Sequence, residues 1–181
     1  MRKVLISVVI LLSMAASADE LADVGKQAPM FRLPVYNSKE VGLPLISLDR
    51  YVGPDPRENG VKAVLISFMA SFCGPCKKEM PYLQSLHQKY KDQGLRIIMV
   101  AIDADEEGQQ KVSELIAKNG VTFPVLKDRF NIVALRWLGK QSPLPSLFMV
   151  KPDGTVATVH RGYSDDASQV LADEVTAALK K

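Results

Sequence analysis

The stretch Val61–Pro81, VKAVLISFMASFCGPCKKEMP, decides both the fold and the chemistry that this sequence predicts. It opens with a nearly continuous apolar run over Val61–Phe68, which is typical of a strand buried on both faces of a sheet. A four-residue connection leads to Cys73-Gly74-Pro75-Cys76, and apolar residues at spacings of three and four predict a helix over Phe72–Gln93. The two cysteines are therefore expected at the start of a helix that directly follows a buried strand.

The start of a helix makes a cysteine more acidic. A free cysteine has a pKa near 8.5, so only a few per cent is thiolate at pH 7. Unsatisfied N–H groups and the helix dipole favour an anion there by about 0.3–2 kcal/mol, which lowers the pKa by up to roughly 1.5 units. We therefore interpret Cys73 as the exposed attacking thiol and Cys76, inside the first turn, as the thiol that resolves the mixed disulfide.

Two other uses of the cysteine pair are disfavoured. A structural disulfide stabilises mainly by closing a loop, and a bridge between residues this close in sequence closes almost none. A zinc site needs about four ligands, and only His87 and His160 remain as soft ligands, at a spacing that fits no compact pattern. The pair therefore predicts redox chemistry, with no metal or other cofactor.

The rest of the chain predicts alternating strands and helices. Two short strands are expected over Met30–Tyr36 and Leu43–Leu48, joined by a turn at residues 37–39 and followed by a loop over Tyr51–Gly60. The later elements are strands over Leu95–Ile102, Phe123–Leu126, Ser146–Val150 and Thr155–Arg161, and helices over Glu106–Lys118, Asn131–Leu138 and Ala167–Leu179. This order predicts an α/β protein with a mixed central sheet flanked by helices.

The first residues have the features of an export signal. Arg2 and Lys3 precede an apolar run over Val4–Met14, and Ala16-Ser17-Ala18 has the form of a signal-peptidase site. The run is shorter than the ~20 residues of a membrane helix, so a cleaved signal peptide over residues 1–18 is expected, with an uncleaved anchor as the alternative. Residues 19–181 are then one exported domain, which we place in the periplasm.

The charge of the chain argues against a nucleic-acid partner. The 181 residues carry a formal charge of +3, and loss of the two leader cations lowers it to +1. No basic stripe interleaved with aromatic residues is present in the sequence.

The segment Phe68–Pro81 resembles the active-site segment of the TlpA-like thioredoxins, the group that includes the cytochrome-c-maturation thioredoxins. Three further stretches agree: Val24–Leu33 resembles the family's N-terminal signature, Phe123–Asp128 its central insertion, and Pro143–Phe148 the loop with its cis-proline. The resemblance implies a thioredoxin fold with an N-terminal strand extension and a central βα insertion.

The resemblance also implies roles for two further residues. A cis bond at Leu144-Pro145 would expose the Leu144 backbone to pair with an extended substrate chain, the alternative being that Pro145 only stiffens a loop. Glu79 lies one turn after Cys76 on the same helix face, where it would tune the thiols or relay protons. The alternative for Glu79 is an ordinary solvated carboxylate.

Two positions depart from the family pattern. Phe72 stands where the family usually has tryptophan, and Ser67 where thioredoxins proper carry a buried aspartate that helps proton transfer. Because a serine cannot act as that base at neutral pH, Glu79 or water would have to serve instead.

The function implied is that of a thiol–disulfide oxidoreductase, acting more as a reductant than as an oxidant. It would use protein clients and a membrane electron donor, and we expect a monomer because no dimerisation segment like that of the isomerases is apparent. Apocytochrome thiols, a metal chaperone and damaged envelope proteins all remain open as clients. A thiol peroxidase is disfavoured because Ala70 supplies no threonine hydroxyl for a peroxide, and a non-catalytic binding module with an idle cysteine pair is the third alternative.

Overall fold

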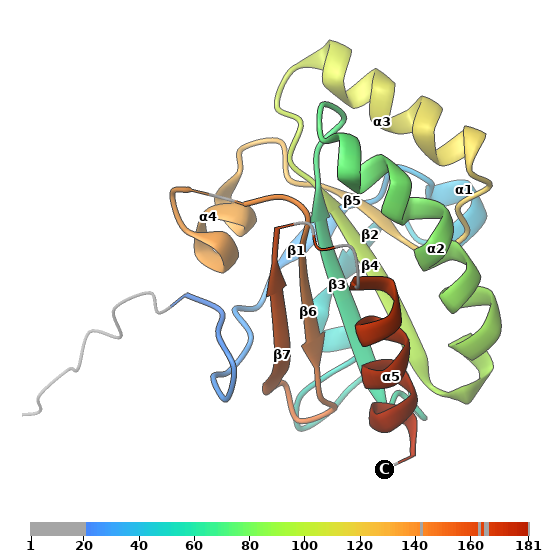
Figure 1. Ribbon diagram of the computed structural model, residues 1–181, viewed down its shortest axis with the longest axis vertical. Helices are drawn as coiled ribbons and strands as arrows, with labels where there is room; N and C mark the ends of the chain where they lie inside the picture. Colours follow the sequence, from blue (N-terminus) through green and yellow to red (C-terminus); the bar gives the residue numbers. More distant parts are fainter. Residues whose placement is uncertain (1–20, 142, 163, 165–166, 181) are drawn as a thin grey trace, which may run out of the picture.

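A five-stranded sheet forms the centre of the protein in a computed structural model that describes residues 21–141, 143–162, 164 and 167–180 (Figure 1). The predicted signal peptide over residues 1–18 lies outside the described residues. The strand order is β5-β4-β3-β6-β7. The strands are β3 (Ala63–Met69), β4 (Leu95–Ala101), β5 (Val125–Lys127), β6 (Ser146–Val150) and β7 (Val156–Arg161).

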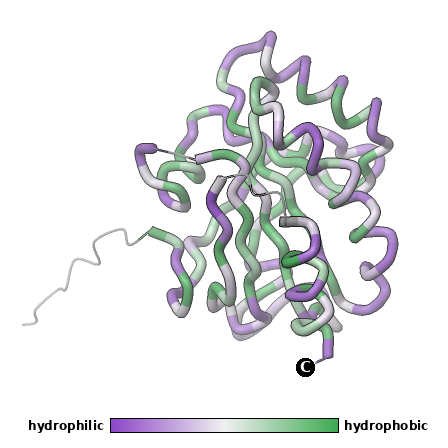
Figure 2. Tube along the Cα trace, in the orientation of Figure 1, coloured by the Kyte–Doolittle hydropathy of each residue, from purple (hydrophilic) through white to green (hydrophobic). Residues whose placement is uncertain are grey.

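The predicted mixed sheet is confirmed, and β3 lies at its middle. Strand β3 pairs in parallel with β4 on one side and antiparallel with β6 on the other. All seven residues of β3 are buried, which explains why its sequence is apolar without the alternation of a half-exposed strand. The hydropathy colouring shows the same concentration of hydrophobic residues along the central strands (Figure 2).

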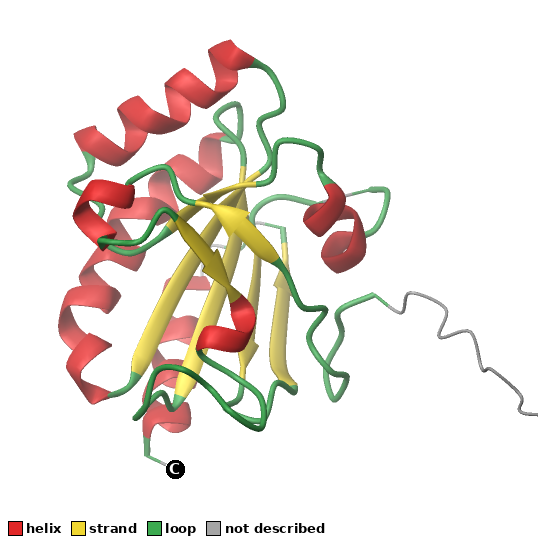
Figure 3. Ribbon diagram, turned by 180° about the vertical axis from the view of Figure 1, so that it is seen from behind, coloured by secondary structure: helices red, strands yellow, loops and turns green. Residues whose placement is uncertain are grey.

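Helices and N-terminal segments cover the two faces of this sheet. On one face pack α2 (Gly74–Tyr90), α3 (Glu106–Lys118) and α5 (Ala167–Leu179). The other face is covered by α4 (Ile132–Leu138) and by the antiparallel pair β1 (Arg32–Pro34) and β2 (Leu45–Ser47), which lies in front of the sheet in Figure 3. The short helices are α1 (Ser38–Val41), η1 (Leu48–Arg50) and η2 (Lys91–Gln93). Within the described ranges, no helix combines the length and the apolar character that crossing a membrane would require.

The N-terminal strands are shorter than the sequence predicted. After β1 the pairing with β2 ends, and the chain turns to the edge of the main sheet. There the Tyr36 N–H donates to the Val125 carbonyl at 2.8 Å. The buried Asn37 side chain then donates to the Phe123 carbonyl at 2.9 Å and accepts from the Val125 N–H at 3.0 Å. These contacts with β5 and the residues just before it end the first strand early, and α1 begins where a simple turn was expected.

Trp137 has a packing role. Its ring is fully buried against Phe68 and Phe148, with centroid distances of 5.7 and 5.0 Å. Its indole N–H donates to the Pro29 carbonyl at 3.0 Å, so the ring also holds the N-terminal extension. This contact ties α4 and the extension to the same face of the sheet.

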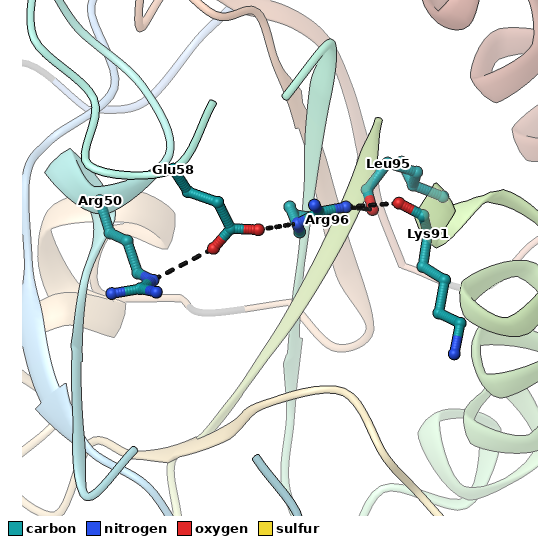
Figure 4. A network of polar contacts seen from close by, with 5 residues as sticks. All are labelled: Arg50, Glu58, Lys91, Leu95 and Arg96. Carbon is teal, nitrogen blue, oxygen red and sulfur yellow. Dashed lines mark hydrogen bonds and ion pairs between the residues drawn. The ribbon is translucent and has the colours of Figure 1, made fainter. Parts of the chain in front are cut away.

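The loop at residues 51–60 is held by a charged network at the end of the sheet where β4 begins. The Glu58 carboxylate accepts from the guanidinium groups of Arg50, at 3.2 Å, and Arg96 (Figure 4). Arg96 lies on β4 and also donates to two nearby backbone carbonyls. The network therefore fastens the loop to the central sheet.

Candidate active site

Helix α2 begins at the cysteine pair, as predicted. Cys73 has extended backbone geometry and is the N-cap residue, and its Sγ accepts the Cys76 N–H at 3.2 Å. Cys73 and Cys76 are joined by a disulfide. The Cys73 sulfur thus occupies the place of the side-chain oxygen that usually satisfies a free N–H at a helix start. An anion at this sulfur would receive the same hydrogen bond and the favourable end of the helix dipole.

The expectation that Cys73 is exposed is wrong for this disulfide-bonded state. Only 8% of Cys73 is accessible, and Cys76 is fully buried. The reason is that the Cys73 sulfur turns inward to bond both the Cys76 sulfur and the Cys76 N–H. Phe72, next to Cys73, is exposed, with 76% of its surface accessible. The order of the two cysteines is nevertheless as expected, since only Cys73 has any contact with solvent.

Asp103 anchors the connection between β3 and the cysteine pair, a residue that the sequence analysis missed. It is buried and accepts the Ser71 N–H through both carboxylate oxygens, at 3.1 and 3.0 Å, and the Ser71 hydroxyl at 2.5 Å. The close approach of α3 depends on Gly108, because a Cβ there would lie 2.7 Å from the Asp103 carboxylate. The signal that could have found it was its place just after β4, since the carboxyl ends of neighbouring parallel strands meet at one edge of a sheet.

Glu79 is a partly buried carboxylate and not the solvated helix residue of the alternative interpretation. It projects from α2 toward β3, where the Ser67 hydroxyl donates to its Oε2 at 3.2 Å. Burial raises the pKa of Glu79 to about 7, while the bond from Ser67 and the charge of His160 oppose the rise. Position 67, where thioredoxins proper carry the buried aspartate, and Glu79, the expected substitute for it, are therefore in direct contact. Near neutral pH, Glu79 can both accept and release a proton.

The peptide bond between Leu144 and Pro145 is cis, as the resemblance implied. Pro145 is buried and directly precedes β6, whose first residue Ser146 pairs with Phe68 near the end of β3. The Pro145 carbonyl accepts the Gly162 N–H at 2.8 Å. Pro145 therefore lies at the same end of the sheet as the segment that leads into the cysteine pair.

A bound metal receives no support from the described side chains. In that part of the chain, no three His, Cys, Asp or Glu side chains are grouped closely enough to hold a metal ion. The two cysteine sulfurs are bonded to each other. The chemistry that this arrangement can perform is the making and breaking of a disulfide with a proton acceptor nearby.

Comparison with curated proteins identifies relatives that are named thiol-disulfide oxidoreductase ResA. The protein of that name from Oceanobacillus iheyensis is 34% identical over 139 residues, which are 77% of this chain and 65% of the relative. Its counterpart from Bacillus cereus strain ATCC 10987 is 33% identical over 146 residues, which are 81% of this chain and 74% of the relative.

Solved structures share the fold. A Chlorobium tepidum structure assigned as a thiol:disulfide interchange protein DsbE superposes with a TM-score of 0.72 at 26% identity, over 87% of this chain and 99% of that one. A secreted disulfide oxidoreductase of Mycobacterium tuberculosis, at 18% identity and a TM-score of 0.61 over 81% and 95% of the two chains, agrees in fold alone.

The profile of the AhpC/TSA family matches residues 24–159, which is most of the chain. This span contains the cysteine pair, Glu79 and Pro145. The predicted resemblance to thioredoxin-like oxidoreductases is confirmed by these matches. The chain therefore has a thioredoxin fold and belongs to the AhpC/TSA family, with the ResA thiol-disulfide oxidoreductases among its relatives.

Proposed function

We propose that this protein is a periplasmic thiol–disulfide oxidoreductase that reduces disulfides of envelope proteins through Cys73 and Cys76. The observation that carries the proposal is the Cys73 sulfur at the N-cap of α2, where it accepts the Cys76 N–H at 3.2 Å. That geometry favours the thiolate, which is the reactive form in disulfide exchange. The names of the relatives support the same activity. The export signal predicted over residues 1–18 supports the location.

The reaction transfers two electrons from the cysteine pair to the client. In the reduced protein the Cys73 thiolate attacks one sulfur of the client disulfide, so that a mixed disulfide forms and the other client sulfur leaves as a thiolate. Cys76 then loses its proton and attacks the Cys73 sulfur. This step releases the second client thiolate and leaves the Cys73–Cys76 disulfide that is present in the structure.

Glu79 is the proposed acceptor of the Cys76 proton. It lies one turn after Cys76 on α2, and burial raises its pKa to about 7. A carboxylate with that pKa is partly ionised at neutral pH and can take a proton from a thiol in the resolving step. Ser67, which cannot serve as the base, holds the Glu79 carboxylate through its hydroxyl.

The loop that contains the cis bond is the proposed contact for the client chain. The Leu144 backbone would pair with an extended client segment in the manner of an added strand. Phe72, with 76% of its surface exposed beside Cys73, offers an apolar surface to the same segment.

The direction of the reaction is set by the reduction potential of the pair. For a reductant we expect a value below about −220 mV, since oxidants of this fold have potentials near −120 mV. Equilibration with glutathione or dithiothreitol buffers, followed by thiol counting, measures the potential. A value near that of the oxidants would reverse the proposed direction, and a membrane dithiol donor would then not be needed to regenerate the reduced pair.

Replacing Cys76 with serine should trap clients as mixed disulfides. Cys73 can still attack a client disulfide in Cys76→Ser, but no second sulfur releases the product. Non-reducing electrophoresis of envelope extracts should therefore show high-mass adducts that dithiothreitol removes. The matched control is Cys73→Ser/Cys76→Ser, which should form none. Recovery of no adducts through Cys73 would count heavily against the proposed function.

A further inference from the structure

Three residues form one row across neighbouring strands of the sheet. Ser67 of β3 pairs with Leu147 of β6, and Leu147 pairs in turn with His160 of β7. Directly paired residues point to the same face, which here is the face covered by α2 and α5. Two strand spacings separate the Cα atoms of Ser67 and His160, a distance of roughly 10 Å.

A carboxylate from a helix meets each end of this row. At one end Glu79 of α2 accepts the Ser67 hydroxyl at 3.2 Å. At the other end Glu174 of α5 lies 2.9 Å from His160 Nε2 and accepts the Thr158 hydroxyl at 2.9 Å. The His160 side chain is 33% exposed and that of Glu174 is 23% exposed, so this end of the row reaches solvent while Ser67 is fully buried.

The groups that face Glu79 come from three elements. Ser67 on β3 donates to it, Cys76 lies one turn before it on α2, and His160 on β7 acts on it through charge. Behind His160, Glu174 on α5 supplies a negative charge that holds the imidazole in place. Within the row only the apolar Leu147 lies between Ser67 and His160, so the charge of His160 can act on Glu79 across the sheet, reduced by the solvent and by Glu174 at the exposed end.

We propose that His160, held in place by Glu174, is a positioning residue of the exchange reaction and acts on Glu79 across the sheet. The inference rests on the proposed function, in which Glu79 takes the proton of Cys76. When protonated, His160 places a positive charge beside the row, and this charge favours the ionised form of Glu79 that can act as the acceptor. His160 thereby extends toward lower pH the range in which the resolving step is fast, against the effect of burial.

The direct test is the titration of the Glu79 carboxyl by ¹³C NMR in the oxidised protein, which requires no client and no turnover. His160→Gln removes the positive charge and keeps a side chain that can donate to Glu174. We expect the midpoint of the Glu79 titration to move up by no more than about 1 pH unit, which is the effect of a full unit charge roughly 10 Å away. The acid limb of the rate profile for disulfide reduction should move by the same amount.

Three variants separate charge from structure. Thr158→Val removes a bond to Glu174 without changing charge and should leave the Glu79 midpoint in place. His160→Lys keeps a positive charge at this position and should leave the midpoint close to that of the unaltered protein. In a Glu79→Gln background, His160→Gln should no longer move the rate profile. The inference is overturned if the midpoint of the Glu79 titration does not move in His160→Gln, or if it moves equally in Thr158→Val. It is also overturned if the midpoint moves in His160→Gln but the pH profile of the rate does not. The proposed function itself is tested separately: it fails if the unaltered protein shows no thiol–disulfide exchange.

Discussion

Cys73→Ser should abolish disulfide reduction, with an expected loss on the order of 10³-fold or more in the rate of insulin reduction. A serine hydroxyl remains protonated at neutral pH and is a poor nucleophile toward a disulfide. The substitution leaves the helix intact, because serine is a favoured N-cap residue and its oxygen can accept the Cys76 N–H that the Cys73 sulfur accepts now. The loss can therefore be assigned to chemistry and not to unfolding.

The companion variant Cys76→Ser keeps the attacking thiol and provides the control. It should still react once with a client-like disulfide, which a single-turnover assay measures, whereas Cys73→Ser should not react at all. Circular dichroism and urea unfolding establish that both variants are folded. Insulin reduction that persists unchanged in Cys73→Ser would mean that the cysteine pair is idle and does not carry out the reduction, which would leave the binding module of the same fold as the better interpretation of the pair.

Glu79→Gln should become more stable relative to the unaltered protein as pH rises. In the oxidised protein the pKa of Glu79 is raised from 4.5 to about 7, chiefly by burial. Between these two values the folded state keeps the Glu79 proton and the unfolded state has released it. The free energy of unfolding of the unaltered protein therefore falls as pH rises through this window. Glutamine carries no charge at any pH, so the stability difference should grow by roughly 3 kcal/mol between pH 4 and pH 8.

Urea unfolding of the oxidised proteins at intervals of pH measures this difference. Glu107→Gln is the matched control, since it makes the same chemical change at a side chain that is 79% exposed on α3. That variant should show no comparable dependence on pH, because an exposed carboxylate is hydrated in both states. A difference between Glu79→Gln and the unaltered protein that does not vary with pH would mean that Glu79 is not held in a desolvated place, and its proposed role in proton transfer would be lost.

Much of the architecture could be predicted from local sequence patterns. The predicted bounds of α3, β6 and α5 agree with the structure, because apolar periodicity and turn residues mark these elements within the segment itself. The strands at the N-terminus were predicted too long. The end of the first is set by hydrogen bonds between Tyr36 or Asn37 and the chain at residues 123–125, more than 80 residues along, and no local pattern contains such contacts.

The sequence by itself determined the position of the cysteine pair, since a buried strand, a Cys-Gly-Pro-Cys segment and an amphipathic helix follow one another directly along the chain. Only the tertiary structure decided the surroundings of that pair. The raised pKa of Glu79 requires the burial that β3 provides, and the row from Ser67 to His160 exists only because β3 pairs in this register with β6 and β7, which lie far along the chain. The order of residues along a segment is fixed by the sequence. The desolvation of a side chain and its interactions with other charges depend on distances that exist only after folding.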